Sequence, residues 1–124
     1  TAVQFNLPIK VFILNNEWMG MVRQWQELLH GGRYSHSYSD SLPDFVKLAE
    51  AYGCAGFRAE NPAELDAKLA EFLAIRDRPA VFDCRVEKAE NCYPMIPSGQ
   101  PHNSMIVGEA SDNPGISEEG KKLV

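Results

Sequence analysis

The chain has 124 residues, about the size of one domain, and its 44% hydrophobic and 23% charged residues are ordinary for a globular protein. Its net charge of −5 argues against nucleic acid and anionic membranes as partners, because both favour basic surfaces. No apolar stretch reaches the roughly 20 residues of a membrane span. The three cysteines lack C-x-x-C spacing and fit the reduced thiols of a cytoplasmic protein.

The chain begins at Thr1 without a methionine, so we expect it to be a piece of something longer, with residues 1–7 as the end of a helix. After Pro8, the apolar run at residues 9–14 predicts a strand. Its lack of alternation predicts burial on both faces, as in a parallel sheet. The run stops at Asn15 and Asn16, which places two amides at the carboxyl end of the strand, where open α/β sheets bind their ligands.

A helix is expected from Gly20 to about residue 29. Its apolar residues recur at offsets of three and four and form one stripe, and burial in a core is the default interpretation of such a stripe. Arg23 is then expected to be an exposed helix arginine. Residues 30–40 have no periodicity and are predicted to form a loop. The stripe consists of Met21, Val22, Trp25, Leu28 and Leu29.

Two further helices carry start and stop signals. Ser41 predicts the N-cap of the first, with an acid at Asp44 in its first turn, and Gly53 ends it. Asn61 followed by a proline predicts the N-cap of the second, which ends before Pro79. Short strands are predicted over residues 54–59 and 80–86.

Alternation of strands and helices predicts an α/β fold with a parallel sheet and flanking helices over residues 1–86. Three strands are few, so we expect an upstream part or a partner chain to complete the sheet. Residues 87–107 are predicted to form an irregular arm, because three prolines fall within residues 91–101. Residues 108–124 are predicted to be a disordered tail, since they contain too little apolar surface to fold.

The asparagine pair is the first candidate for chemistry. An amide oxygen can ligate Mg²⁺, which takes oxygen ligands and commonly holds them together with the phosphates of a substrate. On its own the pair is a weak signal, because asparagines more often simply cap and turn.

Two longer motifs add weight to the magnesium interpretation. The run LNNEWMGMVRQWQ at residues 14–26 resembles the stretch that closes the thiamine-diphosphate motif of acetohydroxyacid synthase (acetolactate synthase) large subunits. The later NCYPMIPSG at residues 91–99 resembles that family's C-terminal arm, and LPDFVKLAEAYG at residues 42–53 resembles the helix after the motif. The resemblance covers residues 1–107 and implies the C-terminal part of a thiamine-diphosphate-binding domain.

The resemblance implies an enzyme that uses thiamine diphosphate and Mg²⁺ to decarboxylate pyruvate and join the two-carbon unit to a second 2-ketoacid, either pyruvate or 2-ketobutyrate. The products are 2-acetolactate and 2-aceto-2-hydroxybutyrate, in branched-chain amino-acid biosynthesis. It also implies FAD, bound mainly outside this chain, and the upstream part of the same subunit. A homodimer or higher oligomer and a regulatory subunit are the further partners implied.

Individual roles follow from the same resemblance. Asn16 resembles the side-chain ligand of magnesium, and Trp18 the residue that ligates it through a backbone carbonyl. Trp25 resembles the tryptophan that shapes the pocket for the second ketoacid and stacks on herbicidal inhibitors. The segment lining the cofactor and the channel corresponds to Gly20, Met21 and Val22. The part of the arm that folds over the channel corresponds to Ser98 and Gly99.

Essential parts of the family's site have no counterpart in this chain. The Gly-Asp-Gly that begins the cofactor motif would lie upstream of Thr1, and the glutamate that activates the cofactor belongs to the family's N-terminal domain. We therefore assign no catalytic residue here and expect the isolated chain to be inactive. Two alternatives stay open: another thiamine-diphosphate enzyme (oxidase, decarboxylase or carboligase), and a free-standing α/β binding module without catalysis, which a start codon just before Thr1 would favour.

Overall fold

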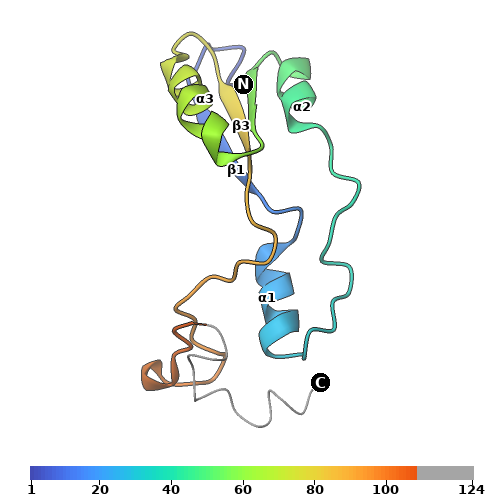
Figure 1. Ribbon diagram of the computed structural model, residues 1–124. Helices are drawn as coiled ribbons and strands as arrows, with labels where there is room; N and C mark the ends of the chain where they lie inside the picture. The colour runs from blue at the N-terminus through green and yellow to red at the C-terminus, as the bar shows by residue number, and fades with distance from the viewer. Residues whose placement is uncertain (109–124) are drawn as a thin grey trace. The chain divides into compact units, whose positions relative to one another are not determined.

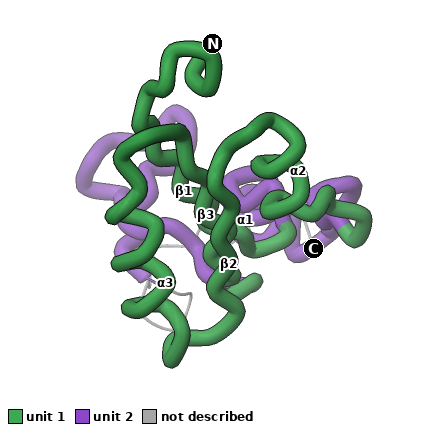
Figure 2. The backbone as a smooth tube through the Cα atoms, turned by 90° about the horizontal axis from the view of Figure 1, so that it is seen from above, with its two compact units in different colours: residues 1–17, 40–88 green, residues 18–39, 89–124 purple. Residues whose placement is uncertain are grey.

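The computed structural model describes residues 1–108 and divides the chain into two compact units (Figure 2). Unit 1 comprises residues 1–17 and 40–88, and unit 2 comprises residues 18–39 and the chain from residue 89 onward. The predicted tail lies outside the described residues, apart from Gly108. No helix among the described residues is long and apolar enough to span a membrane.

Unit 1 is built on a parallel sheet of three strands, β1 (Lys10–Asn15), β2 (Ala55–Ala59) and β3 (Ala80–Arg85). The strand order is β1-β3-β2, so the last strand in sequence lies in the middle. Helices α2 (Phe45–Ala51) and α3 (Pro62–Ala74) flank the sheet on either side (Figures 1 and 2). The predicted α/β fold with a parallel sheet is therefore confirmed.

One face of the sheet carries the apolar core. Phe12 and Phe57 both lie in register with Phe82 on the central strand, and α3 adds Phe72 above them. The rings of Phe12 and Phe82 stack at 4.8 Å, and Phe72 meets Phe82 edge-on at 5.3 Å. Such aromatic pairs add roughly 0.5–1.5 kcal/mol each beyond the burial of their area. This cluster joins all three strands to α3.

The other face of the sheet packs against α2 and leaves little room. A Cβ at Gly56 would lie 2.9 Å from both the side chain and the carbonyl oxygen of Val46, so only glycine allows this approach. Because strand residues alternate between faces, the next residue on this side of β2 is Arg58, which reaches the start of α2. Toward the carboxyl ends of the strands, the α2 face therefore carries charged side chains, whereas the α3 face is aromatic.

Burial of the first strand on both faces, expected from its apolar run, is wrong for the residues described. Val11, Phe12 and Leu14 on β1 are 46%, 42% and 69% exposed. The reason is topological: β1 lies at the edge of the described sheet, and β3, at its centre, has four buried residues and no exposed one.

The ends of the elements follow their local sequence, with one correction. Asn61 caps α3 as predicted, accepting a hydrogen bond from the Glu64 N–H. The N-cap of α2 is Asp44 and not Ser41, because the Asp44 carboxylate accepts from two N–H groups of the first turn.

Residues 2–6 form a turn in which Asn6 has a φ of 52°. The Leu7 and Asn6 N–H groups bond to the carbonyls of residues 2 and 3, the pattern that closes a helix C-terminus.

Unit 2 consists of helix α1 (Gly20–Leu28), the loop that follows it, and the arm. The arm is irregular, as predicted, with one short 3-10 helix, η1 (His102–Ser104). An isolated antiparallel bridge joins Met95 to Ile106 through two hydrogen bonds of 2.8 Å, and both side chains are buried. The arm therefore closes on itself as a loop.

Candidate functional site

The carboxyl end of β1 is shaped by Asn15. Its side-chain oxygen accepts a hydrogen bond from the Glu17 N–H at 3.1 Å, and Glu17 takes a left-handed φ of 63°. A short polar side chain that bonds the backbone two residues on is how an asparagine forms a turn. Asn15 is buried and Asn16, between the two, is half-buried. The first asparagine of the pair thus holds the turn that carries the predicted ligand.

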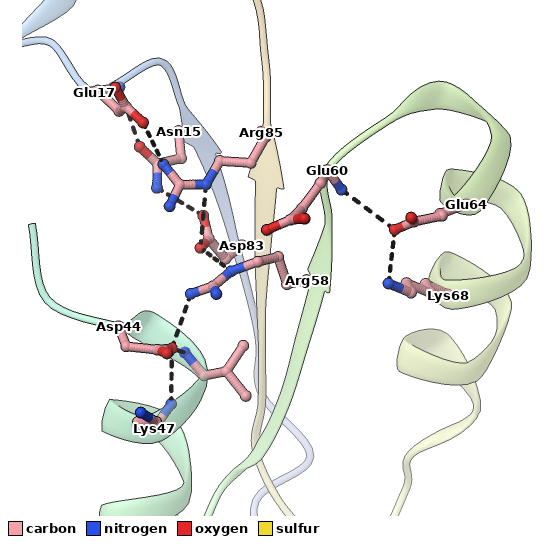
Figure 3. A network of polar contacts seen from close by, with 11 residues as sticks. Asn15, Glu17, Asp44, Lys47, Arg58, Glu60, Glu64, Lys68, Asp83 and Arg85 are labelled. Atoms are coloured by element: carbon pink, nitrogen blue, oxygen red, sulfur yellow. Dashed lines mark hydrogen bonds and ion pairs between the residues drawn. The ribbon is translucent and has the colours of Figure 1, made fainter.

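The turn is anchored to a buried carboxylate at the centre of the sheet (Figure 3). Asp83 on β3 is 0% exposed. It accepts from the Asn15 side-chain amide at 2.8 Å and from Arg58 Nε at 2.9 Å. A buried carboxylate is tolerated when it is paired and hydrogen-bonded, and both conditions are met here. Residues from all three strands meet on this one side chain.

The network continues in both directions along the α2 face (Figure 3). On one side, Arg58 also bonds the Asp44 carboxylate at 2.8 Å, which ties β2 to the start of α2. On the other, Glu17 pairs with Arg85 at 2.9 Å and with Lys88. Glu17 is therefore held by two cations.

Hydrogen bonds lower the pKa of two carboxylates in unit 1, those of Asp44 and Glu64. Bonding to the Lys47 N–H, together with the nearby Arg58 guanidinium, lowers the pKa of Asp44. The side chain of Lys68 first, and that of Asn61 second, lower the pKa of Glu64 at the start of α3.

The thiol of Cys84 shifts in the opposite direction. Burial first, and the neighbouring charge of Asp83 second, raise its pKa. Both causes disfavour the thiolate, which is the reactive form of a cysteine. Cys84 is therefore an inert core residue, whereas Cys92 in the arm is exposed.

In unit 2, aromatic rings fix the position of Trp18. Its ring packs against Tyr38 at 5.0 Å and Tyr34 at 5.3 Å, and the Arg23 guanidinium lies 5.7 Å from its centroid. An isolated antiparallel bridge pairs Trp18 with Tyr38, and the adjacent Met19 N–H donates to the Ser37 carbonyl at 2.8 Å. The backbone at Trp18, whose carbonyl is the predicted magnesium ligand, is therefore held in place by the loop.

Helix α1 buries its polar residues and exposes part of its apolar stripe, which corrects two expectations. Arg23 and Gln24 are buried, at 6% and 1% exposure. Met21, Val22 and Trp25 are exposed. The stripe is therefore not packed into a core of the described residues, and Arg23 is not a solvated helix arginine. The cause is a set of hydrogen bonds from the polar residues to the arm, which hold that face of the helix inward.

The predicted site residues fall into three groups. Asn16 lies in unit 1, next to the end of its first segment, and Trp18 is the first residue of unit 2. Gly20 starts α1, and Met21, Val22 and Trp25 share one exposed face of that helix. The Gln100 N–H donates to the Pro97 carbonyl at 3.0 Å, and Gly99 has a φ of 77°. Ser98 and Gly99 thus form the centre of a type II turn, which requires glycine in its third position.

The predicted oxygen donors suit the chemistry of Mg²⁺, which prefers amide, carbonyl and carboxylate oxygens. No group of three or more histidine, cysteine, aspartate or glutamate side chains that could hold a metal exists within residues 1–108. A metal held through Asn16 would therefore need oxygens from outside this set, as a magnesium ion bridging to phosphates does.

Sequence analysis missed the network around Asp83. The available signal was alternation: Arg58, Asp83 and Arg85 each occupy the face opposite a core residue of their strand. Strands with opposite charges on one face predict pairing across a sheet. Which strands are neighbours, however, was not evident from the sequence.

Comparisons with known proteins agree on one family. The model of the thiamine pyrophosphate enzyme C-terminal TPP binding domain matches residues 1–84. The acetolactate synthase large subunit of Haemophilus influenzae is 42% identical over 112 residues, covering 90% of this chain and 20% of that protein. The acetolactate synthase isozyme 3 large subunit of Escherichia coli is 50% identical over 97 residues, covering 77% of this chain and 17% of that protein.

A solved structure is also similar. A thiamine diphosphate-dependent 4-hydroxybenzoylformate decarboxylase from Rhodococcus jostii RHA1 matches with a TM-score of 0.62 and 29% identity, covering 69% of this chain and 16% of that one. The chain spans about a fifth of the length of the curated relatives that it matches.

Proposed function

We propose that this chain forms part of the active site of an acetolactate synthase large subunit. The chain belongs to the thiamine pyrophosphate enzyme family, and residues 1–84 match the C-terminal TPP binding domain of that family. The similarity to acetolactate synthase large subunits supports the resemblance seen in the motifs. The proposed reaction joins the two-carbon unit of pyruvate to a second pyruvate or to 2-ketobutyrate.

The observation that carries this proposal is the exposed apolar face of α1. Met21, Val22 and Trp25 share that face, and the polar residues of the helix bond to the arm instead. An apolar face that the described residues do not cover is what the wall of a substrate channel requires. These three residues also lie in the run that resembles the family's channel segment.

Asn16 would hold Mg²⁺ through its amide oxygen and Trp18 through its backbone carbonyl. When bound, thiamine diphosphate supplies the carbanion chemistry, and the protein supplies binding, orientation and exclusion of water. The Asp83 network fixes the turn at Asn16, and the aromatic contacts fix the backbone at Trp18. Each donor is thereby held within its own unit before any ligand binds, which lowers the entropy cost of ordering that donor.

Gly20, Met21 and Val22 would line the cofactor and channel, Trp25 would shape the acceptor pocket, and Ser98 and Gly99 would fold over it. The remaining partners follow from the same proposal. FAD would bind mainly outside this chain, and the upstream part of the subunit and a second subunit would complete the site. The proposal also includes a regulatory subunit as a further partner and a cytoplasmic location for the enzyme. The chain by itself is expected to form no acetolactate, because no described residue is assigned as a catalytic acid or base.

The test is a chimera in which this chain replaces its matching segment in the E. coli isozyme 3 large subunit. We expect acetolactate formation that depends on thiamine diphosphate and Mg²⁺. Asn16→Ala should weaken Mg²⁺-dependent cofactor binding at least tenfold, since it removes one ligand oxygen. Asn103→Ala, an exposed residue of η1, is the matched control. Equal cofactor binding in both variants would remove Asn16 from the ligand set.

Trp25→Ala in the same chimera tests the acceptor pocket. We expect an altered ratio of 2-aceto-2-hydroxybutyrate to 2-acetolactate at equal concentrations of the two acceptors, with cofactor affinity unchanged. A product ratio equal to that of the unmodified chimera would contradict the role of Trp25. Acetaldehyde as the main product would instead favour the alternative, a thiamine-diphosphate decarboxylase, to which the similar solved structure belongs.

A further inference from the structure

Helix α1 carries two glutamines that bind different segments of unit 2. Gln24, at 1% exposure, faces the arm. Its side-chain oxygen accepts from the Cys92 N–H at 2.7 Å, and its Nε2 lies 3.0 Å from both the Cys92 carbonyl oxygen and the Met95 sulfur. One side-chain amide thus bonds both backbone groups of Cys92, as a neighbouring strand would.

Neighbouring residues reinforce this contact. Asn91 accepts from Arg23 Nη1 at 3.0 Å and donates to Glu27 Oε1 at 3.0 Å. The polar face of α1 therefore holds three residues of the arm in a fixed register: Asn91, Cys92 and Met95. The bridge between Met95 and Ile106 closes the loop formed by residues 95–106. The turn at Ser98 and Gly99 lies inside that loop.

We propose that Gln24 is a positioning residue, which fixes the arm to α1 and thereby sets the preference for the second ketoacid. This step rests on the proposed function, because it takes α1 as the channel wall and the arm as its cover. Gln24 does not touch the acceptor in this scheme. It acts by fixing the arm to the helix that carries Trp25.

The exposure of Cys92 determines what loss of this contact does. Because Cys92 as a residue is exposed, we expect water to replace Gln24 at its N–H and carbonyl. The arm would then be released without unfolding of the unit. Methionine has nearly the volume of glutamine, so Gln24→Met removes the hydrogen bonds and leaves no cavity.

The second glutamine provides a matched control on the same helix. Gln26 Nε2 donates to the Ser35 carbonyl at 2.9 Å, and its oxygen accepts from the Ser37 hydroxyl at 2.6 Å. It therefore holds the loop after α1 and makes no hydrogen bond to the described residues of the arm. Gln26→Met removes two hydrogen bonds, one at the amide oxygen and one at the amide nitrogen, as Gln24→Met does at Cys92, but it leaves the arm attached.

The first experiment is amide hydrogen exchange on the 124-residue chain. The reporters are the Met95 and Ile106 N–H groups, each of which donates to the carbonyl of the other residue and not to Gln24. We expect exchange in Gln24→Met to be on the order of tenfold faster, because each neutral hydrogen bond shifts an opening equilibrium roughly two- to tenfold. Gln26→Met should leave these two amides as in the unmodified chain. Equal exchange in all three proteins would overturn the proposal.

The second experiment measures the acceptor product ratio in the chimera. Gln24→Met should change the ratio at least threefold with unchanged thiamine-diphosphate affinity, and Gln26→Met should not. Faster exchange with an unchanged ratio would show that Gln24 is merely structural, and would overturn its role in specificity. If the unmodified chimera forms no acetolactate, the proposed function fails, and the exchange comparison alone decides whether Gln24 positions the arm.

Discussion

Replacing Asp83 with asparagine tests the buried network most directly. The substitution keeps the shape of the side chain but removes its charge and exchanges one acceptor oxygen for an NH₂ donor. Asp83 faces two donors, the Asn15 amide and the Arg58 guanidinium. An asparagine can satisfy only one of them, and its NH₂ group must then oppose the other.

The expected loss follows from the exposure of each partner. A hydrogen bond to a charged group contributes about 1.5–3 kcal/mol, and breaking a buried charge pair costs about 3–5 kcal/mol. The Arg58 side chain is 24% exposed and keeps its bond to Asp44, so water and the second carboxylate compensate part of the loss. We therefore expect Asp83→Asn to lower the free energy of unfolding by about 2–3 kcal/mol.

Urea unfolding followed by circular dichroism measures this change. With a slope of about 1–3 kcal/mol/M, the midpoint should fall by about 0.7–3 M. Asp66→Asn, on the exposed face of α3, is the control and should change stability by less than about 0.5 kcal/mol. If Asp83→Asn and Asp66→Asn have the same midpoint, the network contributes no net stability and the reasoning is refuted.

Two further results are expected. The pKa values of Asp44 and Glu64 are lowered on folding, so both carboxylates contribute stability above their unfolded pKa values and lose it as the pH falls through the folded ones. The urea midpoint should therefore fall as the pH is lowered, and it should fall less in a variant with Asp44→Asn and Glu64→Gln. An equal fall in the variant and the unmodified chain would contradict this. Iodoacetamide should label Cys92 first, Cys54 next and Cys84 last, because Cys84 is buried with a raised pKa; early labelling of Cys84 in the folded chain would contradict its place in the core.

Features set by a few neighbouring residues could be predicted from the sequence. The Asn61 cap with proline after it, the stop at Gly53 and the alternation of strands and helices all follow from local backbone chemistry. The error at the start of α2 is of the same kind. Both Ser41 and Asp44 are good capping residues. Asp44 also binds Arg58 on β2, a contact that the local sequence does not reveal.

Burial could not be predicted from the same local patterns. The apolar run at residues 9–14 indicates a buried strand, yet strand order places β1 at the edge of the described sheet. Strand order depends on contacts between residues some 70 positions apart, such as Asn15 and Asp83. Periodicity within one element carries no information about such partners.

Helix α1 shows why its stripe misled the sequence interpretation. Hydrophobic periodicity identifies two faces of a helix and assumes that the apolar one is buried. Here Gln24 is buried, and its side-chain amide bonds both the N–H and the carbonyl of Cys92. Trp25, the next residue, is exposed. Such a helix suits the edge of a binding site. Its polar face attaches it to the arm, and its apolar face is left for a ligand. Burying the polar side costs little because its hydrogen bonds are satisfied, and exposing the apolar side is a cost that ligand binding removes. We therefore expect a ligand that covers Trp25 to stabilise unit 2, which a rise in the urea midpoint on addition of a stacking inhibitor would measure, and no rise in Trp25→Ala.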